Sequence, residues 1–132
     1  MRIVRQLIGK ANLFANKNVE ELVDSVCKKW NDYNIFQKES LLKAITDDTI
    51  KKSNYGYEVF IDYFSGDRNT YLFLVNGFYC HPDKTLSFNK DLLDEKNGAY
   101  VYSVLRHELV RVEQYFLVDN FDKYPERESD IV

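Results

Sequence analysis

The sequence predicts an α+β fold in which helices come first, a small antiparallel sheet follows, and further helices complete the chain. Apolar residues recur at helical spacing between positions 19 and 50, alternate as in strands from 57 to 89, and return to helical spacing from 99 to 117. Hydrophobic residues make up 45% of the 132 residues, which is enough for a core of ordinary size. We therefore assign residues 1–132 to a single domain.

The first half of the chain reads as helical. Asn18 is a predicted N-cap, and acidic residues follow it in the first turn, where the helix dipole favours them. Apolar positions then keep the helical period as far as Trp30, and a second helix is expected over 37–50. The basic segment 1–17 has apolar residues at 4, 7, 8 and 11, which predicts another helix packed on the domain.

The middle of the chain reads as a meander of short strands. Alternation predicts strands over 57–64 and 85–89, and residues 70–75 and 78–80 are rich in β-formers. Turn residues separate these segments at 65–69 and 81–83, and Asn76-Gly77 is a typical two-residue hairpin turn. We therefore expect neighbouring strands to pair in antiparallel order.

A long helix is predicted over 99–117, and a short final helix begins at Pro125. Apolar residues occupy nearly the whole circumference of the long helix, which is typical of a central, buried helix. One face differs, because four polar residues lie above one another at spacings of 4, 4 and 3. These residues are Ser103, His107, Arg111 and Gln114. Such a polar ridge must face water, a cleft or paired partners.

Composition and charge exclude several classes of protein. The net charge of −3 and the lack of a basic block argue against nucleic-acid binding. No apolar run approaches the roughly 20 residues that a membrane span needs. The N-terminal segment has no apolar core or cleavage site of a secretory signal, so we expect a cytoplasmic or virion-associated protein. Cys27 and Cys80 lie in different segments and are interpreted as core thiols.

Two segments of the C-terminal half resemble a known family. His107–Gln114 (HELVRVEQ) is similar to the H-E-x-x-H helix of small bacterial and phage zinc metallopeptidases, and Glu126–Asp130 (ERESD) to the E-x-x-S/A-D segment of gluzincins. The resemblance implies that His107 and Glu126 are remnant metal ligands and that Glu108 is a remnant general base. It also implies that Asp130 hydrogen-bonds a ligating histidine.

The same resemblance assigns a role to the strand at 85–89. It implies an edge strand above the cleft that pairs with an extended substrate or partner. Its residues are Thr85, Leu86, Ser87, Phe88 and Asn89.

Arg111 departs from the family pattern, because it occupies the position of the second histidine ligand. A guanidinium stays protonated and has no free lone pair, so it cannot bind a metal cation. We hypothesise that Arg111 replaces the zinc by an ion pair to Glu126, Glu108 or both. No cofactor is expected, and zinc would bind only if another residue supplies the missing ligand; His81, beside Cys80, is the other histidine available.

These observations favour a non-catalytic zincin-like protein that acts as a binding or structural module for a protein or peptide partner. The surplus of tyrosines, 10 in all, is consistent with a contact surface. Two alternatives remain open from the sequence. One is an active zinc metallopeptidase with an unusual ligand set, and the other is an unrelated α+β binding module such as a toxin immunity protein.

Overall fold

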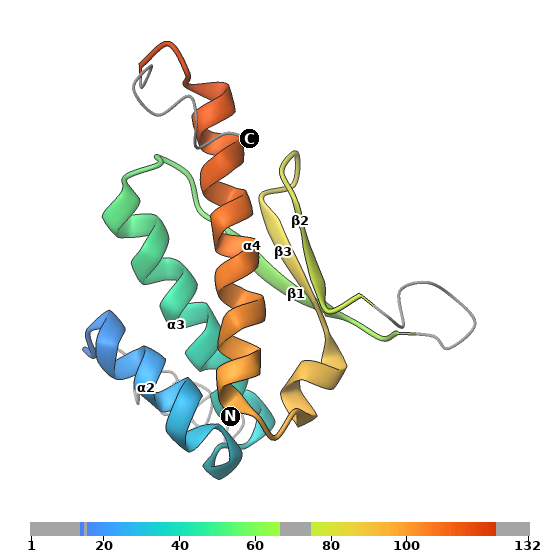
Figure 1. Ribbon diagram of the computed structural model, residues 1–132. Helices are drawn as coiled ribbons and strands as arrows, with labels where there is room; N and C mark the ends of the chain where they lie inside the picture. The colour runs from blue at the N-terminus through green and yellow to red at the C-terminus, as the bar shows by residue number, and fades with distance from the viewer. Residues whose placement is uncertain (1–13, 15, 67–74, 124–132) are drawn as a thin grey trace, which may run out of the picture.

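The computed structural model describes residues 14, 16–66 and 75–123, and it has the predicted α+β fold (Figure 1). In chain order, its elements are α2 (Val19–Lys29), η1 (Trp30–Asp32), α3 (Ile35–Ser53), β1 (Phe60–Phe64), β2 (Gly77–Cys80), β3 (Thr85–Asn89), η3 (Lys90–Asp94) and α4 (Gly98–Asp119). Four predicted features lie outside the described residues: most of the helix at 1–17, nearly all of the strand at 70–75, the final helix after Pro125, and residues Glu126 and Asp130.

Asparagine side chains begin all three helices. The Asn18 side chain accepts a hydrogen bond from the backbone N–H of Glu21 at 2.9 Å, so the predicted cap is confirmed. Asn34 forms a reciprocal capping box with Gln37, which starts α3 two residues before the predicted boundary. Asn97 caps α4 through the N–H of Tyr100. Each cap satisfies an N–H that has no partner inside its helix.

The sheet is mixed, so the prediction of an antiparallel meander is wrong. Its strand order is β1-β3-β2, with β3 antiparallel to β2 but parallel to β1. The alternation of apolar residues shows that a segment is a strand but carries no information on the direction of its partner. Four of the five residues of β3 are buried, which suits a central strand covered on both sides.

Asn76-Gly77 does not form the predicted hairpin turn. Gly77 is the first residue of β2, and the Asn76 carbonyl accepts a ladder hydrogen bond from Asn89 N at 2.8 Å. A type I′ turn needs positive φ at both central residues, which neither Asn76 nor Gly77 has. Gly77 is required for another reason, since a Cβ there would lie 2.7 Å from Cδ1 of Phe88. The turn predicted at 81–83 is confirmed, and it ends at Lys84 with φ +51°.

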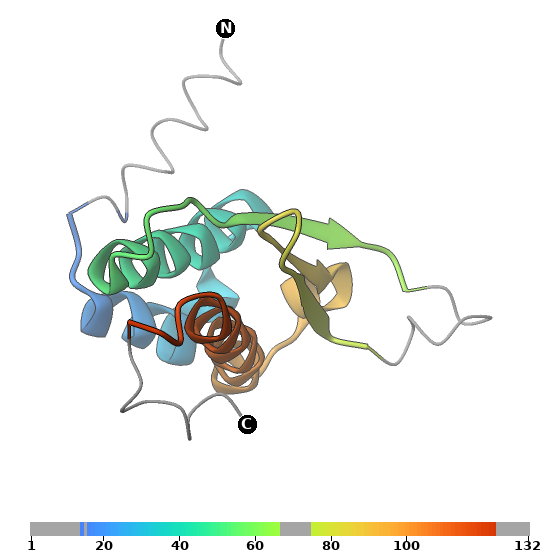
Figure 2. The same ribbon diagram turned by 90° about the horizontal axis from the view of Figure 1, so that it is seen from above.

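Helix α4 lies between α2 and the sheet, and part of its circumference remains exposed (Figure 2). Val101, Leu105 and Val112 lie in the core, whereas Val110 and Val118 are 45% and 48% exposed. The apolar circumference predicted a central, buried helix, and this prediction is too broad because Val110 and Val118 are exposed. The described elements α2 and β2 cover the inward part of the helix, and apolar residues outside that part face solvent.

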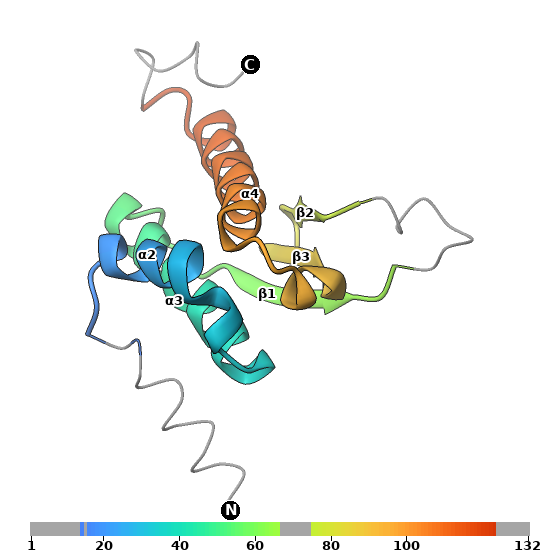
Figure 3. The ribbon, with the colours of Figure 1, turned by 60° about the horizontal axis from the view of Figure 1, so that its bottom comes forward.

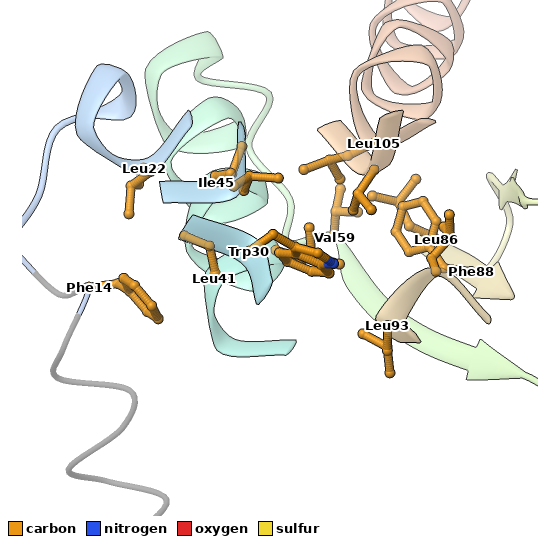
Figure 4. Packing of buried hydrophobic residues seen from close by; sticks show 14 of the residues in the cluster. Phe14, Leu22, Trp30, Leu41, Ile45, Val59, Leu86, Phe88, Leu93 and Leu105 are labelled. Carbon is orange, nitrogen blue, oxygen red and sulfur yellow. The ribbon is translucent and has the colours of Figure 1, made fainter. Parts of the chain in front are cut away.

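The core joins the helices to the inner face of the sheet. Side chains from α2, α3, the strands and α4 come together around Trp30, which is 1% exposed (Figure 4). Lys38 of α3 reaches into this region, where its ammonium donates to the carbonyl of Leu93 at 2.5 Å and lies over the Trp30 ring. This buried cation therefore has both a hydrogen-bond acceptor and an aromatic face as partners.

Candidate functional site

A pocket of about 430 Å³ lies between the first half of α4 and the start of β2. This volume falls within the usual range of ligand sites, which is roughly 300–1,000 Å³. Its lining residues are Asn76, Gly77, Tyr100, Ser103, Val104, His107 and Glu108. The strand β2 is the one nearest to α4, with β3 and β1 following behind it (Figure 3). The pocket thus has a helical wall and a strand wall.

Glu108 is the buried polar residue of this pocket. It follows Val101 and Leu105 on the inward stripe of α4 and is only 7% exposed. Burial raises the pKa of its carboxyl above the ordinary value of 4.5, while the charges of His107 and Arg111 act in the opposite direction. The His107 Nε2 atom lies 3.9 Å from Glu108 Oε1, which is too far for a hydrogen bond.

The opposite end of the pocket is held by hydrogen bonds around Tyr100. The Asn76 amide donates to the Tyr100 hydroxyl at 2.5 Å and so joins the start of β2 to the first turn of α4. The Ser103 hydroxyl donates to the Tyr100 carbonyl at 2.7 Å. These contacts fix the mouth of the pocket across two elements that are distant in sequence.

The strand wall has backbone groups that point to the edge of the sheet, away from β3. Because Asn89 N bonds Asn76 O, and because partners alternate in an antiparallel ladder, the N–H and C=O of Asn76 and Phe78 face β3. The N–H and C=O of Gly77 then point away from β3, toward the edge of the sheet. Among the described residues β2 pairs with no strand at that edge. The pocket therefore combines a buried carboxyl with an unpaired strand edge.

The structure brings together His107 and Glu108 but not Arg111 and Glu108. His107 has a side chain that is 66% exposed, at the rim of the pocket. Arg111 is exposed one turn further along α4, and although both residues are described, no ion pair joins its guanidinium to Glu108. The electrostatic effect of Arg111 on Glu108 thus acts without direct contact. Its other predicted partner, Glu126, lies outside the described residues, as does Asp130.

The polar ridge on α4 faces water along most of its length. Ser103, His107 and Arg111 are exposed and Gln114 is half-buried. The N-terminal part of the ridge, at Ser103 and His107, also borders the pocket. Both environments expected for such a ridge, solvent and a cleft, are therefore present.

The role of substrate edge strand cannot belong to residues Thr85–Asn89. They form β3, which has β1 on one side and β2 on the other, so both of its backbone edges are paired. That prediction is wrong because it was made without the strand order, which local alternation does not determine. The strand that borders the pocket is β2.

The described residues do not fit a catalytic zinc ion. A catalytic zinc site generally needs three protein ligands, and among these residues no group of three His, Cys, Asp or Glu side chains is placed to hold a metal. His107 is the one expected ligand whose position is known, since Arg111 cannot ligate and Glu126 is not described.

His81 lies too far from His107 to supply the missing ligand. Its Nε2 atom is 2.6 Å from a carboxylate oxygen of Asp119, at the C-terminal end of α4, and its Nδ1 is 3.0 Å from the Tyr79 hydroxyl. Asp119 follows His107 by twelve residues, which corresponds to roughly 18 Å along a helix. The ring of His81 also stacks on Tyr115 at 4.8 Å between centroids. His81 is therefore part of an aromatic cluster at the other end of α4.

The strand wall of the pocket was not predicted from the sequence. Asn76 and Gly77 were interpreted as a turn, and Tyr100 was one of many tyrosines without a defined place. The signal in the sequence was Gly77 itself. A glycine within a strand often marks a place where a neighbouring group approaches the backbone closely.

Comparisons with known proteins add no relative, since no family model, curated protein or solved structure matches the chain. Within the part of the chain that the structure describes, no helix combines the length and apolar character that crossing a membrane requires.

Proposed function

We propose that this protein is a non-catalytic, zincin-like module that binds a protein or peptide partner in the pocket between α4 and β2. The observation that carries the proposal is the position of Arg111. Tyr100, Val104, His107 and Arg111 follow one another at spacings of 4, 3 and 4 along one flank of α4, and the first three line the pocket. An arginine thus stands where the resemblance requires a zinc ligand.

The polar character of the pocket supports binding without catalysis. A general base alone, such as Glu108, gives little hydrolysis if no group polarises the scissile carbonyl. The same residues remain useful for recognition, because a partner in extended conformation can reach both the Gly77 backbone and the Glu108 side chain. The loss of the metal ligand therefore removes the chemistry and leaves the binding surface.

The substitution Arg111→His tests this proposal directly. It restores the H-E-x-x-H spacing, so we expect the variant to bind about one zinc ion per chain while the wild-type protein binds none. Zinc content is measured by mass spectrometry after dialysis, and the fold is checked by circular dichroism. Adding Glu126→Gln to Arg111→His should abolish the zinc binding again if Glu126 is the third ligand.

Arg106→His is the matched control, because it places the same side chain on an exposed position of the same helix but outside the ligand spacing. This control should bind no zinc. Zinc in the wild-type protein together with peptide hydrolysis would show an active peptidase and overturn the proposal. A folded Arg111→His variant without zinc would disprove the relation of this helix to a zinc site.

A further inference from the structure

Within the described part of the chain, the buried Glu108 carboxyl has no hydrogen-bonded or ion-paired partner that neutralises it. No described residue donates a hydrogen bond to this carboxyl, and the one ion-pair contact within 4.0 Å that it makes with a described residue is to the His107 ring, at 3.9 Å. A carboxylate in such a position is costly unless a cation or a donor reaches it. The pocket that it lines is open to solvent on the side of His107 and Ser103, so a ligand group can supply what the protein does not.

Another pocket among the described residues does not have this property. It lies at the C-terminal end of α3 and has a volume of about 450 Å³. Its acidic residues Asp47 and Glu58 share the Lys43 ammonium, at 2.9 and 3.5 Å. Both of these carboxylates therefore have an ammonium partner among the described residues, which Glu108 lacks.

We propose that the pocket between α4 and β2 takes the basic side chain, Lys or Arg, of a peptide partner, with Glu108 as its counter-charge. This inference rests on the proposed function, since it specifies the chemistry of the partner. The pocket lining supports it with neutral polar groups, the Asn76 amide and the hydroxyls of Tyr100 and Ser103, around a single buried acid. The two hydroxyls can accept hydrogen bonds from an ammonium or a guanidinium.

The geometry also indicates how the peptide backbone lies. The N–H and C=O of Gly77, which pair with no other described residue, are at the strand wall, so a segment that pairs with them runs along the edge of β2. Side chains of an extended segment alternate between two directions. One of them can then enter the pocket toward Glu108 while its neighbours point away. The net charge of −3 of the protein further favours a basic partner.

The experiment uses blocked pentapeptides, acetyl-Ala-Ala-Xaa-Ala-Ala-amide, in which Xaa is Lys, Arg, norleucine or citrulline. Binding to the ¹⁵N-labelled full chain is followed by the backbone amide signals of Gly77, Ser103 and Glu108. We expect the Lys and Arg peptides to shift these signals and to bind at least tenfold more tightly than the uncharged analogues. The acetyl cap removes the terminal amine as a second source of positive charge.

Glu108→Gln keeps the shape of the side chain and removes its charge, so it should weaken the binding of the Lys and Arg peptides at least tenfold. Glu20→Gln makes the same change at an exposed position of α2 and should leave peptide binding unaltered. Equal binding by Glu108→Gln, or no binding of the basic peptides to the wild-type protein, overturns the inference. Binding of norleucine as tight as that of lysine also overturns it but leaves the proposed peptide site in place. The zinc measurements test the proposed function separately.

Discussion

Gly98 is the residue at which α4 passes directly against α2. A Cβ built at this position would overlap the carbonyl oxygen of Val26 and lie 3.0 Å from the Cβ of Trp30. The first of these contacts is with backbone, which cannot move aside as the end of a flexible side chain can. The absence of a side chain at Gly98 therefore sets the distance between the two helices.

We expect Gly98→Ala to destabilise the protein by about 1–3 kcal/mol or more, the usual cost of overpacking a core. Alanine is the better helix former, so the intrinsic propensity alone would predict the opposite sign. Chemical denaturation with guanidinium chloride measures the difference. Ala99→Ser changes the adjacent, exposed residue and should stay within about 0.5 kcal/mol of wild type. A stable Gly98→Ala variant would show that the contact between α2 and α4 is looser than described.

The raised pKa of the Glu108 carboxyl makes the stability of the protein depend on pH. Its raised pKa means that the folded state holds the proton more tightly than the unfolded chain does, whose carboxyl titrates near 4.5. Between pH 4.5 and the higher folded pKa the folded protein binds more protons, so the contribution of Glu108 to stability falls as the pH rises. At neutral pH the ionised carboxylate therefore destabilises the fold.

Glu108→Gln should consequently raise the melting temperature relative to wild type at pH 7, and the gain should disappear below pH 4.5. Thermal melts at a series of pH values test this expectation. A variant that is less stable than wild type at pH 7 would show that the carboxylate has a stabilising partner in the folded chain. The same melts establish whether Glu108→Gln is folded for the peptide experiments.

At the scale of elements, the turn between β2 and β3 is joined to the end of α4 by His81 and Asp119. The Nε2 atom of His81 approaches the Asp119 carboxylate at 2.6 Å, and the imidazole is nearly parallel to the ring of Tyr115, with 18° between their planes. Lys84 holds the turn from within by donating to the His81 carbonyl at 2.9 Å. The contact is thus a second link between sheet and helix, far from the link between Asn76 and Tyr100.

A double-mutant cycle on His81→Phe and Asp119→Ala should give a coupling energy of about 1 kcal/mol. This is the range for a hydrogen-bonded pair in which His81 is mostly buried and Asp119 is largely exposed. Phenylalanine retains the stacking on Tyr115, so the cycle isolates the polar contact. The cycle of His81→Phe with Asp122→Ala, an exposed acid three residues further on, should be additive. Additivity in both cycles would mean that the pair does not stabilise the protein.

At the scale of the whole molecule, the position of α4 determines what the protein presents to a partner. The helix packs on α2 at one side and on β2 at the other, and its outer surface remains in solvent (Figure 2). The pocket lies where this helix and the strand diverge enough to leave an opening above Glu108. A small sheet that covers only part of a long helix therefore produces a pocket and an exposed helical face together.

Helices were predicted well because their signals are local. Asn18 caps the helix that it was expected to begin, and α4 (Gly98–Asp119) exceeds its predicted range of 99–117 by one residue at the start and two at the end. Caps act within one turn, and the apolar period repeats within a few residues. The α3 boundaries were less accurate, because Asn34 and its reciprocal bond with Gln37 were not recognised as a cap.

The candidate site was predicted on one wall only. His107 and Glu108 were identified from a local pattern, and both line the pocket. Asn76 and Gly77 were missed because a dipeptide that commonly makes a tight turn was instead incorporated into β2. The burial of Glu108 was missed too, although its spacing from Leu105 and Val112 places it on the inward stripe of α4.

The amino-acid sequence alone determined the α+β class, the three described helices and the Asn18 cap. Only the tertiary structure decided that β1 and β3 run parallel, that β3 lies in the centre, and that Glu108 faces a pocket closed by β2. The reason is physical. Helical periods and caps involve residues within a few positions of one another, whereas strand order and pocket walls depend on the packing of segments more than twenty residues apart.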